Sequence, residues 1–211
     1  MKRLILLFVV LTLLLAEPYI TKAILEAIEK KYGLEAKNRF TTLNATLKHL
    51  NDKSDLEKLK GVNDFYNKVA YASDLKNWHI NDYWATPFEF LGRDMGDCED
   101  YVISKYFALR YLGMPSEKLY FSYVKSLKYR QAHMVLTYFE TPKSIPLVLD
   151  NYEHKILLAS KRRDLIPVYN FNGDSLFRAS KKGKQGKPMQ KTDKTHKKWD
   201  ILIEDIKRNK I

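Results

Sequence analysis

Cysteine is nearly absent from this chain of 211 residues, whose one thiol belongs to Cys98. A lone cysteine excludes a disulfide within the chain, so this residue is either buried and inert or present for its reactivity. The sequence also lacks a CxxC pair, an HExxH motif and a P-loop, which leaves zinc hydrolase and nucleotide-binding functions without support. No internal repeat is apparent.

The composition is that of a folded protein with an excess of positive charge. Hydrophobic residues make up 45% and aromatic residues 13%, which is typical of a globular chain, usually of one domain at this length. The formal net charge of +12 would suit nucleic acid, an anionic membrane or an acidic partner. Much of the excess comes from lysines near the C-terminus: Lys181, Lys182, Lys184, Lys187, Lys191, Lys194, Lys197 and Lys198. Loop-forming residues interrupt them, so we interpret this region as a solvated basic tail and expect no nucleic-acid partner.

The N-terminus carries the pattern of an export signal. Lys2 and Arg3 precede an apolar run over residues 4–16, which is too short to span a bilayer comfortably but suits a secretory signal. The cleavage site is poor, because Leu14 occupies the position where a small residue is expected, and residues 21–23 offer only a later alternative. We therefore assign residues 1–16 as an export signal or N-terminal anchor, which predicts an exported protein, tethered to the membrane if the signal is not cleaved.

The first third of the chain is predicted to be mostly helical. Pro18 can open a helix that ends near Lys31, and an apolar stripe at helical spacing follows over residues 43–50. Ser54 and Glu57 fit a capping box at the start of a third helix. These stripes predict core-facing helices.

Two further helix starts surround the cysteine. Thr86 and Glu89 fit another capping box, with a proline in the first turn. A longer helix is expected from about Cys98 to Leu112, with Gly113 as its C-terminal stop.

The second half changes to the pattern of β-strands. We predict strands at residues 119–124, 132–139, 147–149 and 165–171. Helices followed by an antiparallel sheet describe an α+β domain, which we predict over residues 17–175. Residues 176–211 are predicted to be a basic, flexible tail that ends in a short helix around residues 199–206.

Cys98 lies at a predicted helix N-terminus, where aligned peptide dipoles favour a thiolate. An ordinary thiol with a pKa near 8.5 is only about 3% ionised at pH 7. The flanking acids Asp97, Glu99 and Asp100 oppose ionisation, because like charges disfavour the thiolate. The site therefore needs either a nearby imidazolium or a cation that neutralises the acids.

Two downstream residues could complete a nucleophilic site. His133 lies on an apolar strand pattern and Asp150 ends the next one, so a base and its orienter could meet a nucleophile on a helix. Each residue alone could have a purely structural role: such a histidine is often a hydrogen-bonded core residue, and such an aspartate often forms a turn. The remaining histidines rank lower as the base: His49, His79, His154 and, lowest, His196 in the basic tail.

Four short motifs occur in an order that matches a known family. They lie at residues 82–87 (DYWATP), 96–101 (GDCEDY), 132–136 (AHMVL) and 147–151 (LVLDN). Together they resemble the bacterial transglutaminase-like cysteine proteinases, the family of the LapG-type periplasmic proteases. The resemblance covers about residues 62–170 and leaves the lysine-rich tail unmatched.

The resemblance implies a papain/transglutaminase-like fold with Cys98 as nucleophile, His133 as base and Asp150 as orienter. It also implies a calcium ion beside the site, held by the acids that flank the cysteine, which map to Asp97, Glu99 and Asp100. A bound dication would offset these carboxylates, and calcium prefers oxygen ligands.

The resemblance further implies a periplasmic enzyme that cleaves the N-terminal region of a large surface adhesin and so releases cells from a biofilm. In such systems an inner-membrane receptor for cyclic di-GMP sequesters the protease. Trp78 or Trp84 could anchor that contact if exposed, whereas core packing is the simpler interpretation of both residues.

Two alternatives remain open from the sequence. A transglutaminase-type acyl transferase would use the same acyl-thioenzyme with a different acceptor. A non-catalytic domain could instead bind protein or peptidoglycan through its basic surface. The presence of Cys98, His133 and Asp150 together argues against the second alternative.

Overall fold

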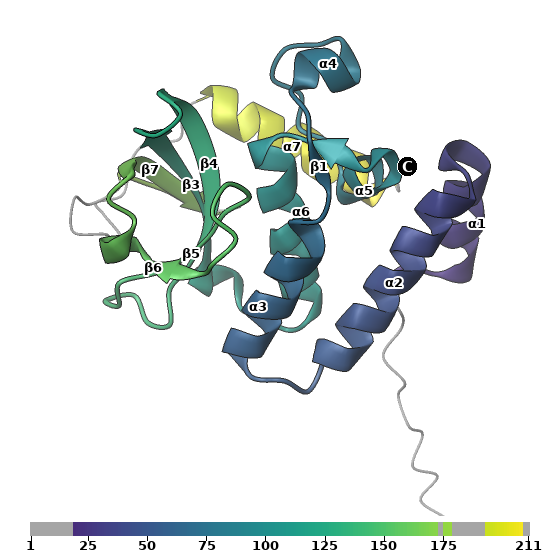
Figure 1. Ribbon diagram of the computed structural model, residues 1–211, viewed down its shortest axis with the longest axis horizontal. Coiled ribbons are helices and arrows are strands. Elements are labelled where there is room, and N and C mark those ends of the chain that lie inside the picture. Colours follow the sequence, from purple (N-terminus) through teal and green to yellow (C-terminus); the bar gives the residue numbers. More distant parts are fainter. Residues whose placement is uncertain (1–18, 173–174, 179–192, 209–211) are drawn as a thin grey trace, which may run out of the picture.

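The computed structural model describes residues 19–172, 175–178 and 193–208, with helices on one side and a sheet on the other (Figure 1). Three helices form its N-terminal part: α1 (Lys22–Tyr32), α2 (Leu34–Leu50) and α3 (Asp55–Tyr66). The predicted helix start at Pro18 lies outside the described residues. The helix itself begins at Lys22, because the Thr21 hydroxyl accepts a hydrogen bond from the Ile24 N–H and caps it.

The predicted α+β class is confirmed. The β-strands are β3 (Leu119–Ser126), β4 (Gln131–Tyr138), β5 (Leu147–Leu149), β6 (Leu157–Leu158), β7 (Leu165–Asn172) and β8 (Ser175–Arg178). They form one antiparallel sheet in the order β6-β5-β4-β3-β7-β8. Two short 3-10 turns, η1 (Ser116–Lys118) and η2 (Ala159–Lys161), precede β3 and β7.

The helix α6 (Cys98–Tyr111) lies at the centre of the fold, between the sheet and the N-terminal helices (Figure 1). Almost every turn of α6 is buried, including the apolar residues Val102, Ile103 and Leu109. Burial on all sides is expected for a helix inside a core and holds its N-terminal end in a fixed place. Gly113, at φ 83°, lies just beyond the helix, as predicted.

A small second sheet connects the remaining helices to α6. Its strands β1 (Ala70–Tyr71) and β2 (Met95–Gly96) pair in parallel. The helices between them, α4 (Asp74–Trp78) and α5 (Pro87–Arg93), are thereby brought to the N-terminal end of α6. Both predicted capping boxes, on α3 and α5, are present.

The C-terminal helix α7 (Asp193–Lys207) includes the predicted short helix but is longer and is packed onto the domain. Trp199 and Leu202 are buried in the main hydrophobic core, where Trp199 contacts Phe121 and Phe171 of the sheet. The predicted domain limit at residue 175 therefore leaves out a helix that belongs to the core, because the apolar face of α7 stabilises that core. The rest of the predicted flexible tail, residues 179–192, lies outside the described residues.

No helix among residues 19–172, 175–178 and 193–208 is long and apolar enough to cross a membrane. The predicted export signal or anchor, residues 1–16, lies outside the part of the chain that the structure describes.

Candidate active site

The thiol of Cys98 stands at the first residue of α6, at the N-terminal end of its helix dipole. The side chain is half-buried, and its thiol donates a hydrogen bond to Glu99 Oε2 at 3.0 Å. Burial, followed by the nearby charges of Glu99 and Asp97, raises the pKa of Cys98 well above its ordinary value, although the Met134 backbone N–H acts in the opposite direction. With these carboxylates unneutralised, the thiol is in its protonated form.

His133 and Asp150 meet in the interior beside this helix. His133 is on β4, Asp150 directly follows β5, and both side chains are buried. His133 Nε2 lies 2.8 Å from Asp150 Oδ1. An ionised carboxylate only accepts hydrogen bonds, so Nε2 carries the proton and Nδ1 of the neutral ring has a free lone pair. Nδ1 is buried and has no hydrogen-bond partner among the described residues.

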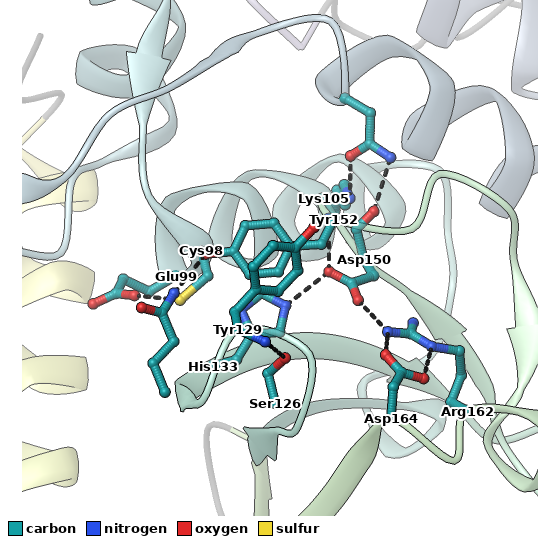
Figure 2. A network of polar contacts seen from close by, with 12 residues as sticks. Cys98, Glu99, Lys105, Ser126, Tyr129, His133, Asp150, Tyr152, Arg162 and Asp164 are labelled. Atoms are coloured by element: carbon teal, nitrogen blue, oxygen red, sulfur yellow. Dashed lines mark hydrogen bonds and ion pairs between the residues drawn. The ribbon is translucent and has the colours of Figure 1, made fainter.

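The thiol lies against the strand that carries this imidazole, since the backbone N–H of Met134, the next residue, contacts its sulfur. Figure 2 shows the Cys98 sulfur and the Asp150 carboxylate on opposite sides of the His133 ring. One ring nitrogen thus faces an orienting carboxylate, while the other is available to a proton from the thiol side.

Asp150 is held in its ionised form by several partners. Burial acts to raise the pKa of Asp150, but hydrogen bonds from His133, the Tyr152 backbone N–H and Arg162 outweigh it and bring the pKa to about 2. Arg162 Nη2 lies 2.7 Å from Asp150 Oδ2. The carboxylate therefore binds the imidazole with one oxygen and a guanidinium with the other.

The other histidines with described side chains stand apart from this arrangement. His49, His79 and His154 are exposed to solvent. The side chain of His196 lies outside the described residues. The structure thus brings together Cys98, His133 and Asp150, the three residues that the sequence pattern singled out.

Four carboxylates gather around the start of α6. One set of possible ligand atoms joins Asp97, Glu99 and the Cys98 thiol; another joins Asp97, Asp100 and Asp74. Asp97 belongs to both sets. The predicted acids Asp97, Glu99 and Asp100 are thus close together, but Asp74 of α4 was missed.

The acidic residues fit a bound cation. Oδ1 of Asp74 and Oδ1 of Asp97 are buried and have no hydrogen-bond partner within the described parts of the chain. Burial, together with Glu99 and Asp100, raises the pKa of Asp97 to about 10. Burial also raises the pKa of Asp74 to about 6. Unpartnered carboxylate oxygens in such a place are the ligands that calcium prefers.

Asp100 has a different role in the same group. Its Oδ1 accepts a hydrogen bond from the Ala85 N–H at 2.9 Å, and its Oδ2 accepts one from the Asp97 N–H at 3.2 Å. These bonds tie the loop before α5 to the N-terminal end of α6. Asp100 therefore fixes the positions of the other acids and has fewer lone pairs left for a metal.

Asp74 could not be predicted as part of this acidic group, because it is far from the other acids along the chain. The parallel pairing of Ala70 with Met95 brings α4 beside α6, and the Tyr83 N–H then holds Asp74 Oδ2 at 2.6 Å. Its local signal is an aspartate directly after Ser73 in the first turn of a helix, where an acidic residue is common because it complements the helix dipole.

The two tryptophans of the aromatic segment differ in exposure. Trp84 is buried in the core and stacks on Phe171, with ring centroids 6.0 Å apart. Trp84 is therefore a core residue, in agreement with the simpler interpretation of its role. Trp78 is half-buried between Tyr83 and the guanidinium of Arg93, which lies 4.1 Å from its ring centroid.

Comparison with known proteins agrees with this geometry. Residues 35–164 match the family described as bacterial transglutaminase-like cysteine proteinases. The chain belongs to this family. Among curated proteins, none matches the chain.

Solved structures similar to this bacterial transglutaminase-like cysteine proteinase include LapG from Legionella pneumophila. The calcium-bound form is 39% identical, with a TM-score of 0.74, over 86% of this chain and 98% of that one. The EGTA-treated form is 38% identical, with a TM-score of 0.75, over 90% of this chain and all of that one. The predicted transglutaminase-like protease fold is thus confirmed.

Proposed function

We propose that this cysteine proteinase is a calcium-dependent endopeptidase in which Cys98 is the nucleophile, His133 the base and Asp150 its orienter. One observation carries the proposal: the 2.8 Å contact between His133 Nε2 and Asp150 Oδ1, while the other imidazole nitrogen, on the side of the thiol, has no hydrogen-bond partner among the described residues. A buried histidine with one oriented nitrogen and one free nitrogen is suited to move a proton.

The reaction follows from these positions. His133 Nδ1 takes the proton of the Cys98 thiol as the sulfur attacks the carbonyl carbon of the scissile peptide. The resulting imidazolium is stabilised by Asp150 through Nε2. It then gives its proton to the leaving amine as the C–N bond breaks, which leaves an acyl-thioester on Cys98. Water, deprotonated by His133, hydrolyses the thioester and restores the thiol.

Calcium would be held by oxygens of Asp97, Glu99 and Asp74, with Asp100 in support. When bound, the ion supplies positive charge that offsets these carboxylates and favours ionisation of the neighbouring thiol. The support comes from the oxygens of Asp74 and Asp97 that have no hydrogen-bond partner in the described part of the chain, and from the likeness to a LapG structure that contains calcium.

We further propose the N-terminal region of a large surface adhesin as the substrate, so that cleavage releases cells from a biofilm. The enzyme would act in the periplasm after export through residues 1–16, either free or tethered by an uncleaved signal. An inner-membrane receptor for cyclic di-GMP would sequester it. Trp78, half-buried at the surface of α4, is the better anchor of the two tryptophans, because Trp84 is in the core.

The test incubates the purified protein with the N-terminal part of a large adhesin from the same cell, with calcium or with EGTA. We expect cleavage that needs calcium and is absent in Cys98→Ala, with circular dichroism showing that the variant is folded. Incorporation of a labelled amine without cleavage would favour the acyl transferase. Binding without either reaction would favour a non-catalytic domain. Equal cleavage by Cys98→Ala would contradict the mechanism.

A further inference from the structure

Arg162 is a buried cation directly behind the proposed catalytic residues. It follows η2, and only 5% of its side chain is exposed. Its Nη2 donates to Asp150 Oδ2 at 2.7 Å, while its Nε and Nη2 donate to the two oxygens of Asp164 at 2.9 and 2.7 Å. Figure 2 shows the row from Asp164 through Arg162 and Asp150 to His133.

This arrangement leads to an inference that rests on the proposed function. We infer that Arg162 is a positioning residue, which keeps the Asp150 carboxylate turned so that one oxygen faces His133, and that Asp164 fixes Arg162 in turn. The guanidinium does not touch the thiol or a substrate and acts only through Asp150.

The geometry of the pairs explains why an arginine suits this place. A planar guanidinium has several donors in a fixed fork, so it can bind Asp164 with two bonds and still reach Asp150. A carboxylate bound at Oδ2 cannot rotate freely about its last bond. The hydrogen bond from His133 to Oδ1 is thereby kept in line.

Stability alone does not require such a group. A buried ion pair can often be replaced by apolar residues with little loss, because taking the charges out of water costs as much as their attraction returns. Arg162 even leaves its Nη1 buried without a hydrogen-bond partner in the described part of the chain. The presence of a buried charged residue at this position is better explained by its effect on the orientation of the Asp150 carboxylate.

Several charged groups face Asp150 from the surrounding elements. His133 approaches from β4 and Arg162 from the turn after η2. Lys105 of α6 adds a positive charge nearby and binds Asn67, whose amide donates to the Asp150 carbonyl at 2.8 Å. Asp164 is an acid that opposes them. Removing Arg162 takes away the cation that binds Asp150 Oδ2, so Asp150 should protonate at higher pH.

The experiment compares Arg162→Gln, Arg162→Lys and Asp164→Asn with the wild type, all in calcium. For Arg162→Gln we expect kcat to fall about 10- to 100-fold with KM nearly unchanged, and the acid limb of kcat to move to higher pH. Arg162→Lys keeps the charge but not the fork, so it should restore the acid limb while recovering only part of kcat. Asp164→Asn should give a smaller fall and serves as the milder variant if Arg162→Gln does not fold.

A second readout does not need any substrate. The Nε2 proton of His133, held in its buried bond to Asp150, should give a downfield proton NMR signal that is absent in His133→Asn. We expect Arg162→Gln to lose or shift this signal and Arg162→Lys to retain it. An unchanged signal and an unchanged acid limb in Arg162→Gln would overturn the inference. If the wild type cleaves no adhesin, the proposed function fails, but the NMR comparison still decides the role of Arg162.

Discussion

The ring of Tyr152 lies parallel to the imidazole of His133, with centroids 4.3 Å apart and planes 8° from each other. The Tyr152 hydroxyl accepts a hydrogen bond from Gln131 Nε2 at 2.9 Å. The stacked ring covers one face of the imidazole and limits its rotation, so Tyr152 and Asp150 together fix the plane in which the histidine can exchange a proton.

Two substitutions of Tyr152 separate the contribution of its stacked ring from that of its hydroxyl. Tyr152→Ala removes the stacked ring, and we expect a loss of about 1 kcal/mol of transition-state stabilisation, or about fivefold in kcat/KM. Tyr152→Phe keeps the ring and should stay within about twofold of the wild type, because it loses only the hydrogen bonds of the hydroxyl with Gln131 and Tyr71. Peptidase assays of both variants decide the matter. Equal losses would show that the hydroxyl, and not stacking, matters.

Asp74 is expected to be a calcium ligand. Asp74→Asn removes one negative oxygen from the acidic group, and calorimetric titration should show a calcium affinity lower by about tenfold, or about 1.4 kcal/mol. The matched control is Asp52→Asn, which removes the same charge from an exposed loop outside the group. An affinity that falls equally in both variants would mean that only the net charge matters.

A glycine is required at position 96 because the side chains of Asp100 and Phe90 approach its Cα closely. An added Cβ would lie 2.5 Å from Asp100 Oδ2 and 2.5 Å from the Phe90 ring, both of which are buried. We expect Gly96→Ala to lower the free energy of unfolding by about 1–3 kcal/mol and to weaken calcium binding through Asp100.

Gly113→Ala is the contrasting control for this glycine. Its Cβ would meet nothing within 4 Å, but its φ of 83° strains any side chain. We expect a loss of about 1 kcal/mol with calcium binding unchanged. Chemical denaturation and calcium titration of both variants test the pair, and unaltered calcium affinity in Gly96→Ala would refute the link to Asp100.

Lys105 is expected to make stability depend on pH. Only 1% of this residue is exposed, and burial lowers its pKa to about 7. The unfolded chain, with its lysine pKa near 10.4, then binds more protons between about pH 7 and 10, so this group makes the free energy of unfolding rise with pH. The slope is at most about 1.4 kcal/mol per pH unit.

The comparison variant is Lys105→Met, which keeps the length of the side chain and removes the titrating group. Urea unfolding at pH 7, 8 and 9 should show a smaller rise with pH in the variant than in the wild type. Parallel curves would mean that Lys105 keeps its ordinary pKa in the fold.

The helices and strands were largely predictable, because their signals are local. The capping box of Ser54 with Glu57 and that of Thr86 with Glu89 both form as their spacing indicates. The strand β5 has the predicted limits, residues 147–149. The packing of α7 was not predictable, since Trp199 is far along the chain from the strands that it contacts.

The candidate site could be predicted only where a motif names its residues. Cys98, His133 and Asp150 stand in recognisable motifs, and the structure brings them together. Asp74 and Arg162 have no such signal: their positions depend on the pairing of β1 with β2 and on the turn before β7. Contacts of this kind are set by tertiary structure and leave no periodic or short-range pattern.

The most direct test of the account is to trap the acyl-enzyme. The wild-type protein is mixed with the N-terminal adhesin fragment in calcium, quenched in acid within one turnover, and measured by intact mass spectrometry. We expect a mass increase equal to the N-terminal cleavage product less one water, located on Cys98, and no such species in Cys98→Ala or in EGTA. Cleavage products that accumulate in the wild type while Cys98 stays unmodified, or that form equally in Cys98→Ala, would contradict a nucleophilic role for this thiol.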